Sequence, residues 1–211
     1  MTEKEWVSEE KKKIRSEIKK KRRELEPGQK KELDRAVLEN LLRLPEFREN
    51  ARPFVCCYVS IGGEVDTLKL METLWLCKIP VAVPRVEGPF IRFYQINGPE
   101  DLAPGCMGIP EPTENCRPVQ RDASVVITPG LAFTPEGKRI GYGGGFYDKF
   151  FEEEPEHIRI AVAYPFQVLP ALPAEECDRR VQILVTSNRI YRCGTMQERN
   201  GNIGQEDGLW N

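Results

Sequence analysis

The sequence predicts an α/β fold with a mixed, mostly parallel sheet that is covered by helices on both faces. Three observations support this class. Strand-like and helix-like segments alternate along the chain, as in βα units. Residues 54–59 form a continuous apolar run, Phe-Val-Cys-Cys-Tyr-Val, which is typical of a strand buried on both faces. Residues 125–127, Val-Val-Ile, form a similar run that leads into a glycine-rich stretch.

Composition limits the class of protein. A chain of 211 residues suits one domain and can bury a core without metal or disulfide staples. The seven cysteines contain no Cys-x-x-Cys pair, which favours reduced thiols in a cytosolic protein. One histidine, His157, excludes a His-rich zinc site and disfavours a Ser-His-Asp triad. A net charge of -2 does not indicate a general nucleic-acid-binding surface, and no signal peptide or membrane-spanning apolar run is present.

The first predicted element is a basic helix over residues 8–25. Ile14 and Ile18 belong to its narrow apolar stripe, and nine lysine and arginine side chains surround that stripe. Most of these side chains fit a solvated face. Lys11 and Arg15 are four residues apart and share one face of the helix, so the alternative is that this pair reaches into a phosphate site.

A second helix, near residues 28–44, follows the Pro-Gly break at 27–28 and should be structural. The strand at residues 54–59 then ends in the loop 61–64, which carries Glu64. Ligands favour the carboxyl end of strands in open α/β sheets, so this loop is a candidate part of a site.

A third helix should begin at Asp66 or Thr67 and run to about Cys77, and two strands follow at residues 79–83 and 90–96. The predicted buried face of this third helix consists of Leu68, Met71, Leu74 and Trp75.

Arg85, at the end of the first of these two strands, is either a surface charge or an anion contact. Residues 97–123 are rich in Pro and Gly and are interpreted as a long loop, which in a compact domain is often functional.

The last predicted strands are residues 158–163 and 181–185. Residues 187–211 lack periodicity and are interpreted as a tail, weakly ordered or docked through Tyr191 and Trp210. We therefore expect one α/β domain over residues 1–187 and a C-terminal tail over residues 188–211.

The most informative stretch is residues 129–151, where a strand leads through a glycine-rich loop into a helix start. Glycines let backbone N–H groups approach an anion, and a helix N-terminus adds unpaired donors and partial positive charge. The loop is neither a P-loop nor a dinucleotide fingerprint, because no Lys follows the glycines and Phe146 stands where a glycine would be needed.

The flanks of this loop favour phosphate over a flexible linker, the other interpretation. Arg139 can grip phosphate oxygens in a fork. Asp148 can cap the helix or bind Mg²⁺.

Two segments, Pro-Gly-Leu-Ala-Phe at 129–133 and Gly-Lys-Arg-Ile-Gly-Tyr-Gly-Gly-Gly-Phe-Tyr-Asp at 137–148, closely resemble the signature of the 5-formyltetrahydrofolate cyclo-ligases. The resemblance covers roughly residues 8–187, because further pieces occur in the family's order. These are Lys-Lys-Lys-Ile-Arg at 11–15, Glu-Val-Asp-Thr at 64–67, Val-Pro-Arg-Val at 83–86, Gly-Ile-Pro-Glu-Pro at 108–112 and Ala-Val-Ala-Tyr at 161–164.

The resemblance implies a three-layer α/β sandwich and an enzyme that closes 5-formyltetrahydrofolate to 5,10-methenyltetrahydrofolate with ATP and Mg²⁺. It also implies a cytoplasmic monomer whose partners are folate and ATP, and neither nucleic acid nor membrane. By this resemblance Arg139 and Tyr147 are catalytic and Asp148 and Asp178 hold the metal. The implied ATP contacts are Lys11, Arg15, Arg139, Ile140, Gly141, Tyr142, Gly143, Gly144, Gly145, Phe146 and Tyr147. The implied folate contacts are Val59, Glu64, Met107, Tyr142, Gly143, Gly144, Gly145 and Phe146.

The chain departs from some relatives at several of these positions. Relatives with Arg or Lys in place of Tyr142 and Gly144 carry more charge in the loop, so the source of a third cation is open. Some relatives have a tryptophan in place of Met107. Gln182 stands where an acidic residue is common, and Asp178 is equally well interpreted as a loop carboxylate that caps a turn.

Two other functions stay open at this level. The basic helix could make the protein a nucleic-acid or protein interaction module, which predicts binding that weakens steeply with salt. A sugar-phosphate or CoA-handling enzyme of similar architecture is the other, on fold analogy alone.

Overall fold

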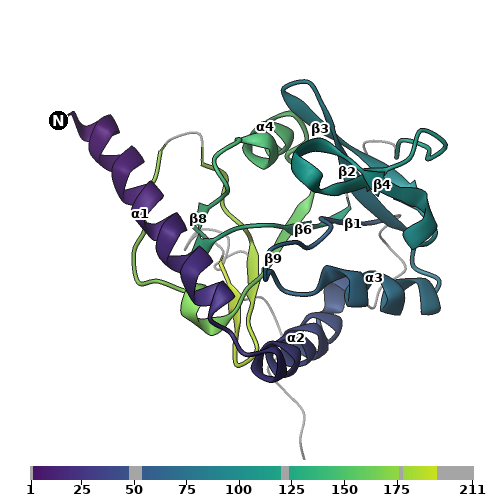
Figure 1. Ribbon diagram of the computed structural model, residues 1–211, viewed down its shortest axis with the longest axis horizontal. Helices are drawn as coiled ribbons and strands as arrows, with labels where there is room; N and C mark the ends of the chain where they lie inside the picture. Colours follow the sequence, from purple (N-terminus) through teal and green to yellow (C-terminus); the bar gives the residue numbers. More distant parts are fainter. Residues whose placement is uncertain (1, 48–53, 120–123, 176–177, 194–211) are drawn as a thin grey trace, which may run out of the picture.

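The computed structural model describes residues 2–47, 54–119, 124–175 and 178–193. Its centre is a seven-stranded sheet with the strand order β11-β10-β9-β6-β1-β2-β3 (Figure 1). The strands of this sheet are β1 (Val55–Cys57), β2 (Val81–Glu87), β3 (Phe90–Ile96), β6 (Val125–Thr128), β9 (Ile158–Val162), β10 (Ile183–Val185) and β11 (Ile190–Arg192).

The five inner strands are parallel and the two edge strands are antiparallel. Strand β1 lies between β2 and β6, with Val55 opposite both Val81 and Val125. At the edges, β3 runs antiparallel to β2 and β11 runs antiparallel to β10. This arrangement confirms the predicted mixed, mostly parallel sheet, and the inner strands β1 and β6 belong to the continuous apolar runs expected when both faces are buried.

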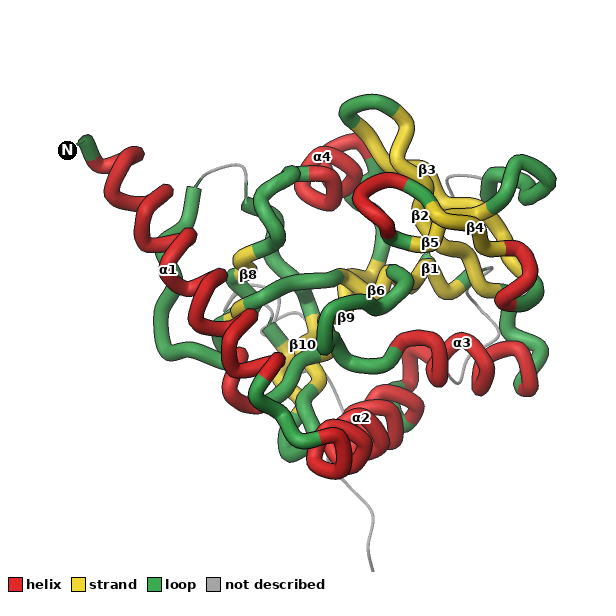
Figure 2. Tube along the Cα trace, viewed as in Figure 1, coloured by secondary structure: helices red, strands yellow, loops and turns green. Residues whose placement is uncertain are grey.

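Helices cover both faces of the sheet, as Figure 2 shows. Val55 and Cys57 point into a cluster with α2 (Pro27–Leu42) and α3 (Thr67–Leu76). Cys56, between them, points to the opposite face, where it packs in a cluster with Phe150 of α4 (Phe146–Glu153). The alternation of side chains along a strand therefore divides the core into two layers.

Helix α1 (Glu3–Arg23) packs mainly on a small hairpin formed by β7 (Ala132–Phe133) and β8 (Arg139–Ile140). Ile18, 1% exposed, belongs to one cluster with residues of that hairpin. The helix begins earlier than predicted, because Thr2 and Glu5 form a capping box. The hairpin leads directly into the glycine-rich loop, so α1 lies beside that loop.

Helix α3 corrects one part of the sequence interpretation. Asp66 caps the helix by accepting a hydrogen bond from the Lys69 amide. Leu68 was predicted to be buried and is 42% exposed, whereas Leu70 is 2% exposed. Leu70 has buried neighbours on both sides, Thr67 three residues before it and Leu74 four residues after it, whereas Leu68 has such a neighbour on one side only.

Residues 97–119, the described part of the predicted loop 97–123, contain regular structure. Strand β4 (Leu102–Pro104) pairs antiparallel with β5 (Pro110–Pro112). The guanidinium of Arg85 donates hydrogen bonds to the carbonyl oxygens of Pro112 and Thr113. Arg85 is therefore a structural tie between β2 and this segment. Prolines in both short strands hid the strand periodicity in the sequence.

Strand β11 lies beyond residue 187, the predicted end of the α/β domain. It pairs with β10, and Tyr191 packs against a buried cluster that includes Val181 and Leu184. The proposed docking through Trp210 concerns a residue outside the described part of the chain. Among the helices of the described residues, none is both long and apolar enough to cross a membrane.

Two leucines of α3 give a matched test of this packing. Leu74 is 0% exposed and Leu76 is 85% exposed. We predict that Leu74→Ala lowers the free energy of unfolding by about 2–5 kcal/mol, because the truncation leaves a cavity in the core. Leu76→Ala should change the same quantity by no more than about 0.5 kcal/mol. Urea denaturation of both variants measures the difference, and equal losses would contradict the placement of α3.

Candidate active site

A cavity of about 640 Å³ lies at the carboxyl ends of β1, β2 and β6, the edge of the sheet that the sequence indicated. It gathers nearly all the site residues inferred from sequence. The exception is Met107, whose side chain lies outside the described part of the structure. The predicted residues that line the cavity are Lys11, Arg15, Val59, Glu64, Arg139, Ile140, Gly141, Tyr142, Gly143, Gly144, Gly145, Phe146, Tyr147, Asp148 and Asp178.

The glycines of the loop are needed for its backbone path. Gly143 and Gly145 have φ angles of 109° and 68°, which residues with a side chain adopt only under strain. A Cβ atom at Gly144 would lie 2.8 Å from the Phe146 ring. Gly145 is the N-cap of α4 and has no side chain with which to cap it, so the first amides of the helix can face an anion in the cavity.

Two cations of α1 approach the loop in different ways. Arg15 Nε donates a hydrogen bond of 2.9 Å to the Gly141 carbonyl oxygen, and its Nη atoms make no hydrogen bond to a described residue. Lys11 Nζ lies 2.7 Å from both a Glu175 and an Asp178 carboxylate oxygen. Burial alone would lower the pKa of Lys11, but these two carboxylates outweigh it and raise the pKa.

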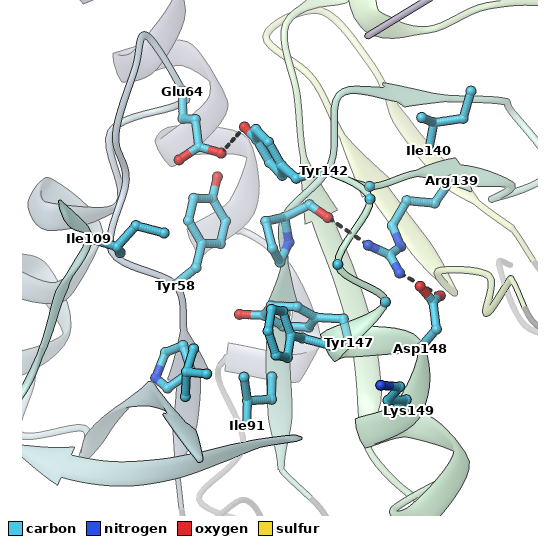
Figure 3. Close-up of a pocket in the computed structure, with 18 of the residues that line it drawn as sticks. Tyr58, Glu64, Ile91, Ile109, Arg139, Ile140, Tyr142, Tyr147, Asp148 and Lys149 are labelled. Carbon is cyan, nitrogen blue, oxygen red and sulfur yellow. Dashed lines mark hydrogen bonds and ion pairs between the residues drawn. The ribbon is translucent and has the colours of Figure 1, made fainter. Parts of the chain in front are cut away.

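Asp148 is tied to Arg139 beneath the loop, as Figure 3 shows. Arg139 Nη2 lies 2.6 Å from Asp148 Oδ1, and Nη1 donates to the Pro129 carbonyl oxygen at 3.0 Å. The Arg179 amide also donates to Asp148 Oδ1. Asp148 accepts its described hydrogen bonds from these groups and not from the helix amides, so the helix-capping alternative does not describe it. Both Nη atoms of Arg139 are engaged, so a phosphate contact by Arg139 would require these bonds to exchange.

Asp178 bonds to the backbone of Glu175 and to Lys11. Its Oδ2 atom accepts a hydrogen bond of 2.7 Å from the Glu175 amide as well as the contact from Lys11. These contacts match the turn-capping interpretation.

One carboxylate of the cavity has an oxygen that could contact a metal ion. Across the described residues, no three His, Cys, Asp or Glu side chains form a group that could hold a metal ion. Asp148 Oδ2 makes no hydrogen bond to a described residue, and Asp148 lines the cavity. Mg²⁺ is commonly held by one or two carboxylates together with substrate phosphates, and Asp148 fits that role.

Glu64 lies in the cavity wall opposite Arg139 and Asp148 (Figure 3) and is 4% exposed. Its Oε2 atom accepts a hydrogen bond from the Ile61 amide at 2.9 Å, and its Oε1 atom accepts one from the Tyr142 hydroxyl (Figure 3). Burial raises the pKa of Glu64, and these hydrogen bonds together with the charge of Arg22 offset part of that rise.

The sequence interpretation missed Arg22, which it placed on the solvated face of α1. Arg22 is 5% exposed, and its Nη1 atom donates to the Tyr142 hydroxyl at 2.5 Å. A signal was present, because position 22 is four residues after Ile18 and shares its face of the helix. A cation therefore stands at Tyr142, although the loop itself carries none there. Glu175 was also missed, since its site role depends on contact with α1.

Tyr147 and Ile140 differ in what they offer the cavity. The Tyr147 hydroxyl is buried and makes no hydrogen bond within the described residues, and Figure 3 shows it between Tyr58 and Ile91. Burial raises the pKa of Tyr147 well above its usual value, so the phenol stays neutral. Ile140 is 1% exposed and packs in the cluster of α1, so its contribution to a ligand would come from its backbone.

Comparison with known proteins identifies relatives over almost this whole chain. The model of the 5-formyltetrahydrofolate cyclo-ligase family matches residues 7–187. The 5-formyltetrahydrofolate cyclo-ligase of Haemophilus influenzae is 31% identical over 173 residues, which cover 78% of this chain and 91% of that protein. The Escherichia coli protein of the same name is 30% identical over 184 residues, covering 82% of this chain and 98% of that protein.

Solved structures agree with these relatives. The NMR structure of Aquifex aeolicus 5,10-methenyltetrahydrofolate synthetase has a TM-score of 0.77 at 31% identity and covers 94% of this chain and 96% of that one. A 5,10-methenyltetrahydrofolate synthetase from Mycoplasma pneumoniae shares the fold, with a TM-score of 0.68 at 20% identity over 84% of this chain and 98% of that one. Sequence, coverage and fold together show that the chain belongs to the 5-formyltetrahydrofolate cyclo-ligase family.

Proposed function

We propose that the protein catalyses the ATP-dependent closure of 5-formyltetrahydrofolate to 5,10-methenyltetrahydrofolate, with release of ADP and phosphate. Family membership supports the reaction, and one observation supports its location. A single cavity brings a glycine loop with Arg15 beside it together with a buried carboxylate, Glu64. The glycine loop and Arg15 suit a phosphate, and the Glu64 carboxylate suits the N–H donors of a pterin.

The chemistry asks for positioning more than for covalent catalysis. The formyl oxygen attacks the γ-phosphorus of ATP, the bond to the β-phosphate oxygen breaks, and ADP leaves. The neighbouring amine nitrogen of the folate then attacks the activated carbon and loses its proton. The carbon–oxygen bond breaks and phosphate leaves with the electron pair, which completes the ring. Orientation and stabilisation of phosphate charge carry reactions of this kind.

Residues 139–147 form the proposed phosphate cradle. The Nη atoms of Arg15, which no described residue engages, suit a forked contact with phosphate oxygens. Lys11 would reach phosphate by exchanging its contacts with Glu175 and Asp178. Since those carboxylates become available as Lys11 leaves, Asp178 is the proposed partner of Asp148 in holding Mg²⁺. The metal supplies charge neutralisation on the phosphates.

The proposed folate contacts are Glu64 with Val59, Tyr142 and Met107 around it. Each carboxylate oxygen of Glu64 can accept more than one hydrogen bond, so the pterin N–H groups can be added to the contacts from Ile61 and Tyr142. The neutral hydroxyl of Tyr147 is a proposed donor to the reacting oxygen. Arg139 would position Asp148 through their ion pair.

The direct test is ADP formation measured with and without 5-formyltetrahydrofolate. We expect ADP release to depend on the folate and to match the methenyl product in amount. ATP hydrolysis that is indifferent to the folate, or no turnover at all, would contradict the proposed reaction.

We predict that Asp148→Asn lowers turnover by about 10- to 100-fold or more and raises the Mg²⁺ concentration needed, because an amide is a poorer metal ligand. Loss of the charge beside Arg139 should also reduce stability by roughly 1–3 kcal/mol. Glu153→Gln, an exposed change on the same helix, is the control. Mg²⁺ titrations of turnover decide, and an unchanged Mg²⁺ dependence of Asp148→Asn would remove the metal assignment.

For Glu64→Gln we predict a folate Kd about 10- to 100-fold higher and an ATP Kd near that of the wild type. Charge-assisted hydrogen bonds to the pterin become neutral ones, and a single amide carbonyl cannot replace two carboxylate oxygens. Glu72→Gln, exposed on α3, serves as the control. Calorimetric titration with each ligand separates the two affinities, and equal effects on both would count against this placement.

The contribution of α1 is tested by four variants. Lys11→Ala and Arg15→Ala should raise the KM for ATP by about 10-fold or more, because each removes a charge-assisted contact. Arg15→Lys should fall short of the wild type, since an ammonium lacks the guanidinium fork. Lys20, exposed and 3.8 Å from Glu24, gives the control Lys20→Ala, which should change little. If all four variants have a similar KM for ATP, the basic helix is better explained as an interaction surface.

A further inference from the structure

Arg22 is buried where a basic helix would be expected to face water. Its side chain is 4% exposed, in the last turn of α1. Nη2 donates a hydrogen bond of 2.7 Å to the Gly130 carbonyl oxygen, at the exit of β6, and Nη1 donates to the Tyr142 hydroxyl. Burial of a guanidinium is costly unless its charge has a counterpart. The carboxylate of Glu64, with Oε1 3.8 Å from Nη1, is that counterpart.

The hydrogen bonds between these three side chains have a fixed direction. A guanidinium can only donate, so the Tyr142 oxygen accepts from Arg22 Nη1. The single phenol proton is then donated to Glu64 Oε1. An acceptor at the end of such a chain must have a free lone pair, which both oxygens of an ionised carboxylate provide. The hydrogen bonds thus lead from Arg22, a permanent cation on α1, through Tyr142 to the Glu64 carboxylate in the wall of the cavity.

The loop that carries Glu64 also rests on the backbone of the same turn. Gly63 has a φ angle of 77°, and a Cβ atom there would lie 3.3 Å from the Arg22 carbonyl oxygen. Arg22 therefore meets the Glu64 loop through both its backbone and its side chain. The orientation of Glu64 depends on where the end of α1 lies.

We propose that Arg22 is a positioning residue for the folate substrate, acting through the Tyr142 hydroxyl to hold the Glu64 carboxylate ready to accept the pterin N–H groups. This inference rests on the proposed function, in which Glu64 binds the pterin. Arg22 itself touches neither substrate nor the reacting atoms in this assignment, so its effect should be seen in folate affinity and in the pH dependence of that affinity.

Electrostatics gives the expected sign. Burial raises the pKa of Glu64, while the Tyr142 hydrogen bond, the Ile61 amide and the charge of Arg22 lower it. Removal of Arg22 should raise this pKa further, so that Glu64 takes up a proton at a higher pH and loses acceptor capacity there. The titratable and charged groups that face Glu64 from the surrounding elements are Arg22 of α1, Lys30 of α2, Cys57 of β1, Tyr58 after β1, Tyr142 of the loop and Tyr147 of α4.

The test measures the Kd of 5-formyltetrahydrofolate, without ATP, between pH 5 and pH 9. Arg22→Met keeps much of the side-chain length and removes the charge. We expect its Kd at neutral pH to be about 10- to 100-fold higher than that of the wild type. The acid limb, which is the pH range in which folate affinity is lost on acidification, should move up by between about one and three pH units. Arg23→Met, the exposed neighbour, is the matched control and should follow the wild-type profile.

A double-mutant cycle with Glu64→Gln tests whether Arg22 acts through the carboxylate. In the Glu64→Gln background, Arg22→Met should add little to the folate Kd, because no carboxylate remains to be held. Three results would each overturn the proposal. The first is a folate Kd of Arg22→Met equal to that of the wild type, and the second is a ratio of these two Kd values that does not change with pH. The third is full additivity of the two substitutions in the cycle.

Two further measurements keep the test informative if Arg22→Met folds poorly. Tyr142→Phe removes the bridging hydroxyl and should move the acid limb in the same direction, and Arg22→Lys should restore the pH profile more than the affinity. The carbon NMR shift of the Glu64 carboxyl gives its pKa without any ligand. If Glu64→Gln leaves folate binding intact, the pterin contact of the proposed function fails. If Glu64→Gln weakens binding but Arg22 variants change neither the Glu64 pKa nor the affinity, only this inference fails.

Discussion

Three arginine side chains hold the glycine-rich segment by its backbone, and the cavity depends on this. Arg139 donates to the Pro129 carbonyl oxygen, Arg22 to Gly130 and Arg15 to Gly141. A run of glycines has no side chains with which to fix its own path, and its backbone loses more entropy on ordering than that of other residues. Charged donors that reach its flanking carbonyls supply the missing constraint, since hydrogen bonds from charged groups are the stronger ones.

The same arginines couple the loop to acidic groups on other elements. Arg139 pairs with Asp148 of α4, and Arg22 lies opposite Glu64 of the loop after β1. Lys11, in turn, is held between Glu175 and Asp178. Lys11, Arg22 and Arg139 therefore each have an anionic partner within the protein. An incoming phosphate or metal ion would exchange partners with an existing pair, which limits the cost of keeping these charges buried.

This view separates two kinds of residue in the site. Arg15 is anchored through Nε and its Nη atoms make no hydrogen bond to a described residue, whereas Arg139 uses both Nη atoms within the protein. The hydroxyl of Tyr147 is buried without a described partner, and that of Tyr142 is engaged on both sides. In the proposed reaction, Arg15 and Tyr147 offer groups without a described partner, Lys11 and Glu64 contact ligands from within existing interactions, and Arg139 supports Asp148.

Much of the fold and of the site could be predicted from local sequence. Continuous apolar runs identified β1 and β6, because a strand buried on both faces is almost wholly apolar. The spacing of glycines before Phe146 identified the loop, and the position of Asp148 just inside the helix identified a carboxylate beside it. The strand β11 and the β4–β5 pair were missed, since they are short and their hydrogen bonds join residues whose local pattern is weak.

The sequence by itself determined which chemical groups are present at the sheet edge, because the strand, the glycine loop and the helix start are contiguous along the chain. Only the tertiary structure decided which cation meets which anion. The nine basic residues between Lys11 and Arg23 are nearly equivalent in sequence, and the packing of Ile18 on the hairpin selects the face that turns inward. That rotation buries Lys11 and Arg22 and leaves Arg23 in water. The free energy of burying one apolar stripe sets the orientation of the helix, and the charges of the site follow from it.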